Sequence, residues 1–253
     1  MLIKRKRTRT HTEDRHLALV LATTAGTLNA MALGAFGFFP SHMSGNTSQL
    51  SSEVSTSDLS DLLLLASIIT AFVLGSFTSR LLVICGIRNT LRTIFSLILL
   101  LEGVMLILAS IFEIFFYSAK NNHEAVVFLG FLMGIHNATS TQLSDGRVRS
   151  THITGTLTDA GIALGSIMMT LARRDPSKQV SAQRKQFFTH LITISSFLTG
   201  GIAGLLLFKL YGFHSMIAVG IFLVLIASSA IALTLYTVKK GPSSPCGDKQ
   251  QPL

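Results

Sequence analysis

Two short motifs of this chain nearly repeat each other. Residues 42–49 read HMSGNTSQ, and residues 152–159 read HITGTLTD, 110 positions further along. Upstream of each motif, GTLNA at 26–30 has a counterpart in GIHNA at 134–138. Because the likeness covers an apolar segment and the loop after it, we infer that the chain contains two copies of one structural unit.

Long apolar segments surround the motifs. Hydrophobic residues make up 49% of the 253 residues and charged residues only 13%, with a mean hydropathy of +0.55. These polar residues are too few to cover a soluble globule, so the predicted fold class is an all-α integral membrane protein in a lipid bilayer. A helix needs about 20 apolar residues to cross a hydrocarbon core. We expect six transmembrane helices, near residues 17–38, 62–84, 92–117, 125–143, 187–208 and 212–238.

Basic residues are distributed unevenly between the expected loops. Nineteen of the 21 Lys and Arg lie before the first helix, around the second turn, in the fourth loop or in the C-terminal tail. The opposite side keeps only Lys120 and Lys209. Because positively charged loops stay in the cytoplasm, we expect both termini to be cytoplasmic. The same rule accounts for the net charge of +9, so we do not expect nucleic acid as a partner.

We expect one membrane domain flanked by two tails. Residues 1–16 and 239–253 are polar and basic and are predicted to be cytoplasmic tails. The domain, 17–238, divides into repeats at about 17–117 and 124–238. Three crossings per repeat is an odd number, so the second repeat enters the membrane from the opposite side. Inverted repeats are typical of secondary transporters, whose sites lie near the midplane at the repeat interface.

Each motif has the spacing of a helix start. Asn46 is followed three residues later by Gln49, and Thr156 is followed three residues later by Asp159. In a capping box of this kind, the first residue accepts a hydrogen bond from the first turn and the second reaches back to it. We therefore predict that Asn46 and Thr156 cap two helices.

A glycine precedes each predicted cap. Gly45 and Gly155 supply either a permissive backbone or room for close approach. The segments that follow, 47–59 and 157–171, are too short or too polar to be confident spans. We expect each motif to dip into the membrane and end in a re-entrant half-helix, whose N-terminus suits an anion or a polar solute. The alternative is an ordinary capped helix in the membrane interface.

These features predict a site for a small polar or anionic solute where the two motifs meet. Polar side chains within membrane helices either bond to neighbouring helices or line such a site. One histidine per motif forms no ligand cluster, so we expect no metal and no cofactor, and we favour a hydrogen-bonding role for both histidines. The candidate substrate-binding residues are Asn29, His42, Ser44, Gly45, Asn46, Gln49, His136, Asn137, His152, Thr154, Gly155, Thr156 and Asp159.

Glu102 is expected near the middle of the third spanning helix. An acid in the apolar region is costly and is a functional candidate by default. We assign it as a candidate proton carrier, although no Lys or Arg in the same helix is placed to pair with it. The alternative is a helix shift that brings Glu102 closer to the membrane interface.

A transporter or channel is the function that the motifs favour. The alternative is a non-transporting assembly or partner-binding protein, in which the motifs only lock helices together. An intramembrane hydrolase is less favoured: Ser44 beside His42 resembles part of a nucleophile arrangement, but the second copy repeats the pattern with Thr154, which symmetry explains better. We therefore do not expect an enzyme. No oligomeric state follows from the sequence.

The motifs resemble those of the YoaK family of bacterial multi-pass membrane proteins of unknown function. The resemblance covers about residues 17–235 and rests on SGNT at 44–47, GxxNA at 134–138 and RSTHITGTLTD at 149–159. Members usually have Thr-Gly-Asn in the first motif, and Ser44 here keeps the hydroxyl. The resemblance implies an integral protein of the bacterial inner membrane. It implies no substrate, reaction or cofactor.

Overall fold

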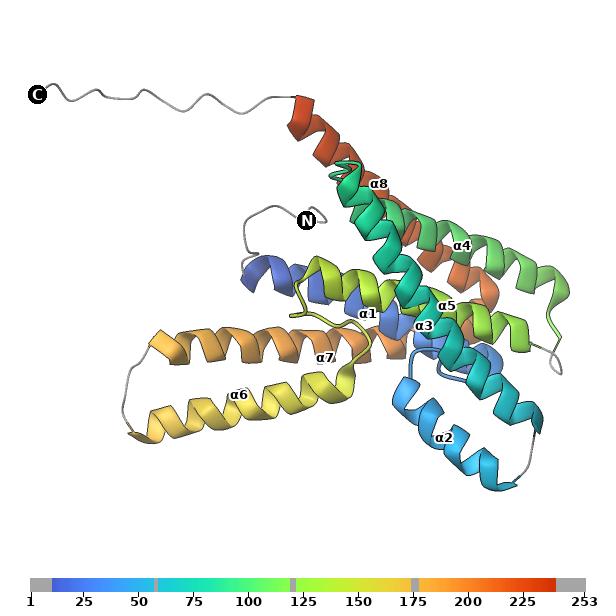
Figure 1. The fold of residues 1–253 in the computed structure, drawn as a ribbon, viewed down its shortest axis with the longest axis horizontal. Helices are drawn as coiled ribbons and strands as arrows, with labels where there is room; N and C mark the ends of the chain where they lie inside the picture. Colours follow the sequence, from blue (N-terminus) through green and yellow to red (C-terminus); the bar gives the residue numbers. More distant parts are fainter. Residues whose placement is uncertain (1–10, 57–58, 119–121, 174–177, 240–253) are drawn as a thin grey trace, which may run out of the picture.

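The computed structural model describes residues 11–56, 59–118, 122–173 and 178–239 (Figure 1). In these residues the chain forms eight helices and no strand, which confirms the predicted all-α class. The helices in chain order are α1 (His11–Phe36), α2 (Met43–Thr56), α3 (Leu59–Arg88), α4 (Ile94–Phe116), α5 (His123–Leu143), α6 (Ile153–Arg173), α7 (Lys178–Tyr211) and α8 (Phe213–Lys239).

Six of the described helices are long and apolar enough to cross a membrane. They are α1, α3, α4, α6, α7 and α8. Their number agrees with the six predicted spans, and so do five of the segments. The exception is the span predicted at 125–143. A helix, α5, does form there, but polar residues such as Asn137 and Gln142 lower its hydropathy, and α6 is the sixth candidate instead.

The helix after the second motif is longer than the sequence predicts. The motif spacing predicts a half-helix over 157–171, whereas α6 runs from Ile153 to Arg173 and is long enough to span a membrane. The difference arises at both ends, because the helix begins before the expected cap and continues past Leu171. The helix after the first motif, α2, has only 14 residues, a length that fits both the half-helix and the interfacial helix expected from the sequence.

The first helix begins earlier than its apolar segment. Residues 1–16 are predicted to be a tail, but His11 to His16 already belong to α1. The apolar span within α1 starts at Arg15, so the polar residues before it extend the helix beyond that span. The remaining parts of the two predicted tails, 1–10 and 240–253, lie outside the described residues.

The outer surface of the helix bundle is apolar. Phe77, Leu198 and Leu225, for example, are 59%, 60% and 63% exposed. Large apolar side chains exposed on this scale are unfavourable in water, whereas lipid tails solvate them. Together with the six apolar helices, this surface is consistent with a multi-pass membrane protein.

The α1–α7 pair has one of the most extensive helix contacts of the bundle. A Cβ atom on Gly26 of α1 would collide with the carbonyl oxygen of Phe197 on α7. A Cβ atom on Gly200 of α7 would likewise collide with the carbonyl oxygen of Thr23 on α1. The two glycines therefore allow the helix backbones to touch, as small residues do in membrane bundles.

The α3–α5 pair repeats this arrangement. A Cβ atom on Gly75 of α3 would collide with the carbonyl oxygen of Phe131, and one on Gly134 of α5 with that of Phe72. Gly134 opens the GIHNA segment, and Gly26 opens its counterpart GTLNA. Equivalent glycines of the two sequence copies therefore make equivalent helix contacts.

The other helix contacts are paired in the same way. α2 packs on α3 as α6 packs on α7, and α3 meets α4 as α7 meets α8. α4 crosses α8 where Gly103 and Gly220 face each other, and a Cβ atom on either glycine would lie 2.9 or 3.0 Å from the other's carbonyl oxygen. Within the described chain, each helix of the first half thus has a counterpart with matching neighbours in the second half.

Candidate functional site

One cavity brings the two motifs together. It has a volume of about 670 Å³. Figure 1 shows α2 and α6 extending away from each other, with their first turns toward the middle of the molecule. Residues from both motifs, from α1 and α5 and from two neighbouring helices line the cavity: Asn29, Phe39, Ser41, His42, Met43, Ser44, Phe72, Asn137, Thr151, His152, Ile153, Thr154, Gly155 and Phe197.

The first motif starts its helix at the histidine. The backbone N–H of Asn46 donates to the carbonyl oxygen of His42 at 2.9 Å, which is the first bond of α2. His42 is therefore the N-cap residue, and Asn46 lies in the first turn. The predicted cap at Asn46 is wrong, because the helix begins three residues before Asn46, at Met43.

The second motif starts its helix in the same way. The N–H of Thr156 donates to the carbonyl oxygen of His152 at 3.1 Å, and α6 begins at Ile153. The predicted cap at Thr156 is wrong for the same reason. Neither predicted capping box forms. Asn46 and Thr156 already lie inside their helices, so neither is an N-cap whose backbone N–H could bond to Gln49 or Asp159.

The motif glycines make room for the histidine rings. A Cβ atom on Gly45 would collide with the imidazole of His42, and a Cβ atom on Gly155 would collide with that of His152. Neither glycine has a positive φ. Of the two roles predicted for them, close approach is therefore the one that the structure supports, since each ring lies against the first turn of the helix that it caps.

Asn46 and Thr156 stabilise their turns from the protein side. Both are buried, at 5% and 7% exposure. The Asn46 amide Nδ2 donates to the carbonyl oxygen of Phe39 at 3.4 Å, and the Thr156 hydroxyl donates to that of His152 at 2.9 Å. Neither side chain lines the cavity, so their role in this structure is to hold the motifs in place.

The two helix asparagines, Asn29 and Asn137, both reach the cavity but differ in their bonds. The Asn29 Oδ1 accepts hydrogen bonds from the backbone N–H of Ser41 at 3.2 Å and from its hydroxyl at 2.8 Å. It thereby ties the loop before α2 to α1. The Oδ1 of Asn137 is shielded from solvent and has no hydrogen-bond partner among the described residues. Asn137 therefore lines the cavity but keeps a buried acceptor that is not satisfied.

Seven of the thirteen candidate residues line the cavity, and six do not. Gln49 and Asp159 are exposed and do not line this cavity. Asp159 lines a different hollow, between α6 and α7, together with His190. The seven lining residues are Asn29, His42, Ser44, Asn137, His152, Thr154 and Gly155, and the others are Gly45, Asn46, Gln49, His136, Thr156 and Asp159.

Glu102 has a partner that sequence reasoning missed. Its Oε1 lies 2.7 Å from Nδ1 of His136, and Nε2 of that ring lies 3.0 Å from the carbonyl oxygen of Leu21. Both side chains are buried, and they join α4, α5 and α1. Since a carbonyl oxygen only accepts, Nε2 carries a hydrogen, and one proton is shared between Nδ1 and Oε1.

The sequence does hold a signal for this pair. In the two copies GTLNA and GIHNA, Leu28 is replaced by His136, so a polar residue breaks the repeat at a helix position. A search for Lys or Arg in the helix of Glu102 misses a histidine 34 residues away on another helix. Elsewhere in the described chain, no group of three or more metal-ligating side chains is close enough to hold a metal ion.

One family matches most of the chain. The family described as "Protein of unknown function (DUF1275)" matches residues 17–229, which run from the first apolar helix into α8. No curated protein and no solved structure matches the chain. The chain therefore belongs to the DUF1275 family of proteins of unknown function.

Proposed function

We propose that this protein carries or conducts a small polar or anionic solute across a membrane through the cavity between its two motifs. The observation that carries the proposal is that a single cavity of about 670 Å³ is lined by matching residues of both motifs, with the starts of α2 and α6 at its wall. A binding site between two copies of one unit is the arrangement expected of secondary transporters.

The N-termini of α2 and α6 determine which class of solute the proposed site prefers. The N-terminus of a helix carries partial positive charge and free N–H groups, so two such ends at one cavity favour an anion or a polar group. Ser44 and Thr154 add hydroxyls, and His42 and His152 add ring nitrogens. Within the described chain, none of these four side chains makes a hydrogen bond, so all four are available to a solute.

Inverted topology is part of this proposal. Its support is the exchange pattern of the helix contacts, in which α1 packs on α7 and α5 packs on α3. The opposite directions of α2 and α6 and the uneven distribution of basic residues agree with it. The proposed setting is the bacterial inner membrane with both termini in the cytoplasm, as the charge pattern and the resemblance to the YoaK family imply.

Glu102 is the proposed proton carrier. It shares one proton with His136, and His136 precedes Asn137, whose side chain lines the motif cavity. A change in the charge of the buried pair therefore acts one residue away from the proposed solute site. Buried acids and histidines of this kind form proton relays in pumps and transporters.

Solute flux in proteoliposomes tests the proposed transport. The full chain is reconstituted, and the entry of chloride, formate and glycerol is followed by stopped-flow light scattering. We expect at least one of these probes to enter faster than in protein-free liposomes. We expect Thr154→Val to slow that flux about tenfold, because it removes a hydroxyl from the cavity wall but preserves the shape of the side chain.

Thr158→Val is the matched control. Thr158 lies one turn further along α6 and is exposed outside the cavity, so the same substitution there leaves the flux unchanged. Flux of all three probes at the protein-free rate contradicts the proposal. In the alternative, an assembly or partner-binding protein, Thr154→Val lowers the melting temperature or disrupts assembly, and no flux depends on it.

A further inference from the structure

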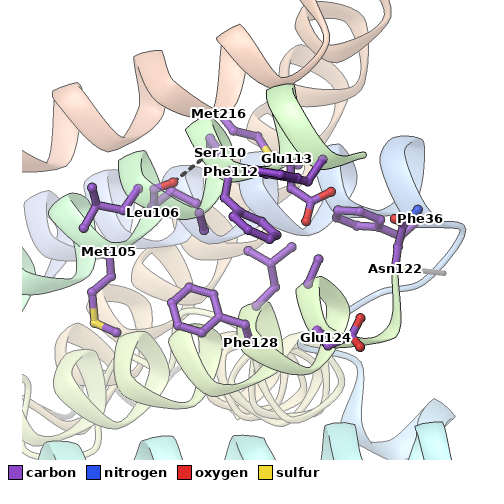
Figure 2. Close-up of a pocket in the computed structure, with 15 residues that line it drawn as sticks. Phe36, Met105, Leu106, Ser110, Phe112, Glu113, Asn122, Glu124, Phe128 and Met216 are labelled. Carbon is purple, nitrogen blue, oxygen red and sulfur yellow. Dashed lines mark hydrogen bonds between the residues drawn. The ribbon is translucent and has the colours of Figure 1, made fainter. Parts of the chain in front are cut away.

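A second cavity lies between the C-terminal end of α4 and the N-terminal end of α5. Its volume is about 380 Å³, and it shares no lining residue with the motif cavity. Figure 2 shows that α1, α5 and α8 contribute walls in addition to α4. The rings of Phe36, Phe112 and Phe128 and the side chains of Met105 and Met216 make it mainly apolar.

A buried carboxyl group points into this apolar space. Glu113 is only 9% exposed, and its Oε2 is shielded from solvent with no hydrogen-bond partner among the described residues (Figure 2). The other polar groups nearby are engaged elsewhere. The Ser110 hydroxyl donates to the carbonyl oxygen of Leu106 at 2.7 Å, and the Asn122 Oδ1 accepts from the N–H of Ser118 at 3.2 Å.

The ionisable side chains that line the cavity are acidic. Glu124, at the start of α5, also lines it, and none of the described lining residues is Lys or Arg. An unpartnered carboxylate in an apolar site is strongly disfavoured unless a cation compensates it. Two carboxylates facing one space attract a positive ligand and exclude an anion.

The walls select an organic cation rather than a metal ion. Ca²⁺ and Mg²⁺ need about six oxygen ligands, and here carbon atoms form most of the surface. Aromatic rings attract ammonium groups through their faces, and methionine side chains adapt to apolar ligands of different shape. A volume of about 380 Å³ lies within the usual range for small-molecule pockets.

We propose that this cavity binds a small hydrophobic ammonium ion, with Glu113 pairing the charged nitrogen and the aromatic rings surrounding the apolar part. Glu124 adds attraction at the more exposed side of the cavity. The site is separate from the motif cavity, so the inference does not depend on the proposed transport function.

Equilibrium binding of benzyltrimethylammonium tests this site. The full chain is purified in dodecyl maltoside, which carries no charge and no amine, and the tritiated probe is titrated. We expect saturable binding of the probe, and we expect Glu113→Gln to weaken it at least tenfold, because the substitution keeps the shape and removes the charge. Glu124→Gln weakens it only a few-fold, since Glu124 is exposed to solvent.

Two controls make the test specific. Glu53→Gln on α2 makes the same chemical change outside the cavity and leaves binding unchanged. Neopentylbenzene, the uncharged carbon analogue of the probe, does not compete in wild-type protein if the charge is recognised. If Glu113→Gln fails to fold, Glu113→Asp keeps the charge and retains saturable binding.

Three results overturn the inference. They are the absence of saturable binding at millimolar probe, equal binding by wild type and a folded Glu113→Gln variant, and competition by neopentylbenzene as strong as that by unlabelled probe. The last result means an apolar pocket for neutral molecules, in which Glu113 stays protonated.

Discussion

At the scale of single residues, the Glu102–His136 pair is the most unusual feature of the bundle. Two ionisable side chains are buried among apolar helices, and the second carboxylate oxygen of Glu102 has no partner in the described chain. Buried pairs of this kind add little stability relative to apolar residues, yet losing one member is costly. The equivalent position in the other repeat is occupied by Leu28, a buried apolar residue that requires no ionisable partner.

Single and double substitutions at Glu102 and His136 distinguish the effect of the pair on stability from its proposed role in proton transfer. We expect His136→Leu to lower the free energy of unfolding by about 3 kcal/mol, because Glu102 stays buried without its partner. The double variant with Glu102→Leu recovers most of this loss, since two apolar side chains replace the pair. Thermal unfolding in detergent measures both changes.

The double variant then tests the proton role. If Glu102 carries protons, the folded double variant no longer responds to a pH gradient in the liposome flux assay. A pH-driven flux equal to that of wild type contradicts the proton role and leaves the pair as a structural contact.

Residue-scale features were the hardest to predict. The sequence indicates which polar residues lie near the motifs, and seven of the thirteen candidates line the cavity. It does not reveal that the Glu102 partner comes from another helix, because that contact depends on how α4 and α5 pack. It also misplaces the caps: a histidine carbonyl begins each helix, and histidine is a weaker capping signal than the Asn and Thr in the same motifs.

At the scale of helices, length and apolar content predict most elements. The predicted spans agree with five of the six apolar helices because a hydrocarbon core demands long apolar segments. The sixth differs because α5 carries polar side chains such as His136, Thr139 and Ser140 on its buried face and is not among the helices apolar enough to span a membrane, whereas α6 is. Hydropathy records composition, whereas burial within the protein depends on the neighbouring helices.

Glycine positions in the helix pairs offer a direct test of packing. We expect Gly75→Ala to lower the free energy of unfolding by about 1–3 kcal/mol, because its Cβ meets the carbonyl oxygen of Phe131 and the α3–α5 pair has to separate. Thermal unfolding in detergent measures the effect.

Gly161→Ala is the matched control. Gly161 in α6 has open space where the Cβ atom would lie, so the substitution only increases helix propensity and stabilises by up to about 1 kcal/mol. Equal destabilisation by both substitutions would contradict the close contact between α3 and α5.

At the scale of the whole molecule, the two sequence copies correspond to two sets of four helices. The repeated motifs predict a shared site, and the structure places residues of both around one cavity. The sequence does not predict that helices of one half pack against helices of the other half. Similarity between two sequence copies does not indicate whether a helix packs within its own copy or against the other copy. The exchange of partners became visible only in the contacts of α1 with α7 and of α3 with α5.

Accessibility of single cysteines tests the proposed inversion. Ser48→Cys and Thr158→Cys place thiols at equivalent exposed positions of α2 and α6, in a chain whose Cys85 and Cys246 are replaced by serine. We expect membrane-impermeant maleimide to label them from opposite faces of sealed vesicles. Labelling of both positions from the same face rules out the inverted arrangement.

The exchanged helix pairs also limit when the helices can pack during biosynthesis. The main partner of α1 is α7, and these helices are more than 140 residues apart in the chain. During translation, α1 is therefore synthesised long before α7. The face of α1 that carries Gly26 has no partner until most of the polypeptide has been made. Neither half can complete its helix packing alone. The first half therefore reaches its final packing only after the second half has been synthesised.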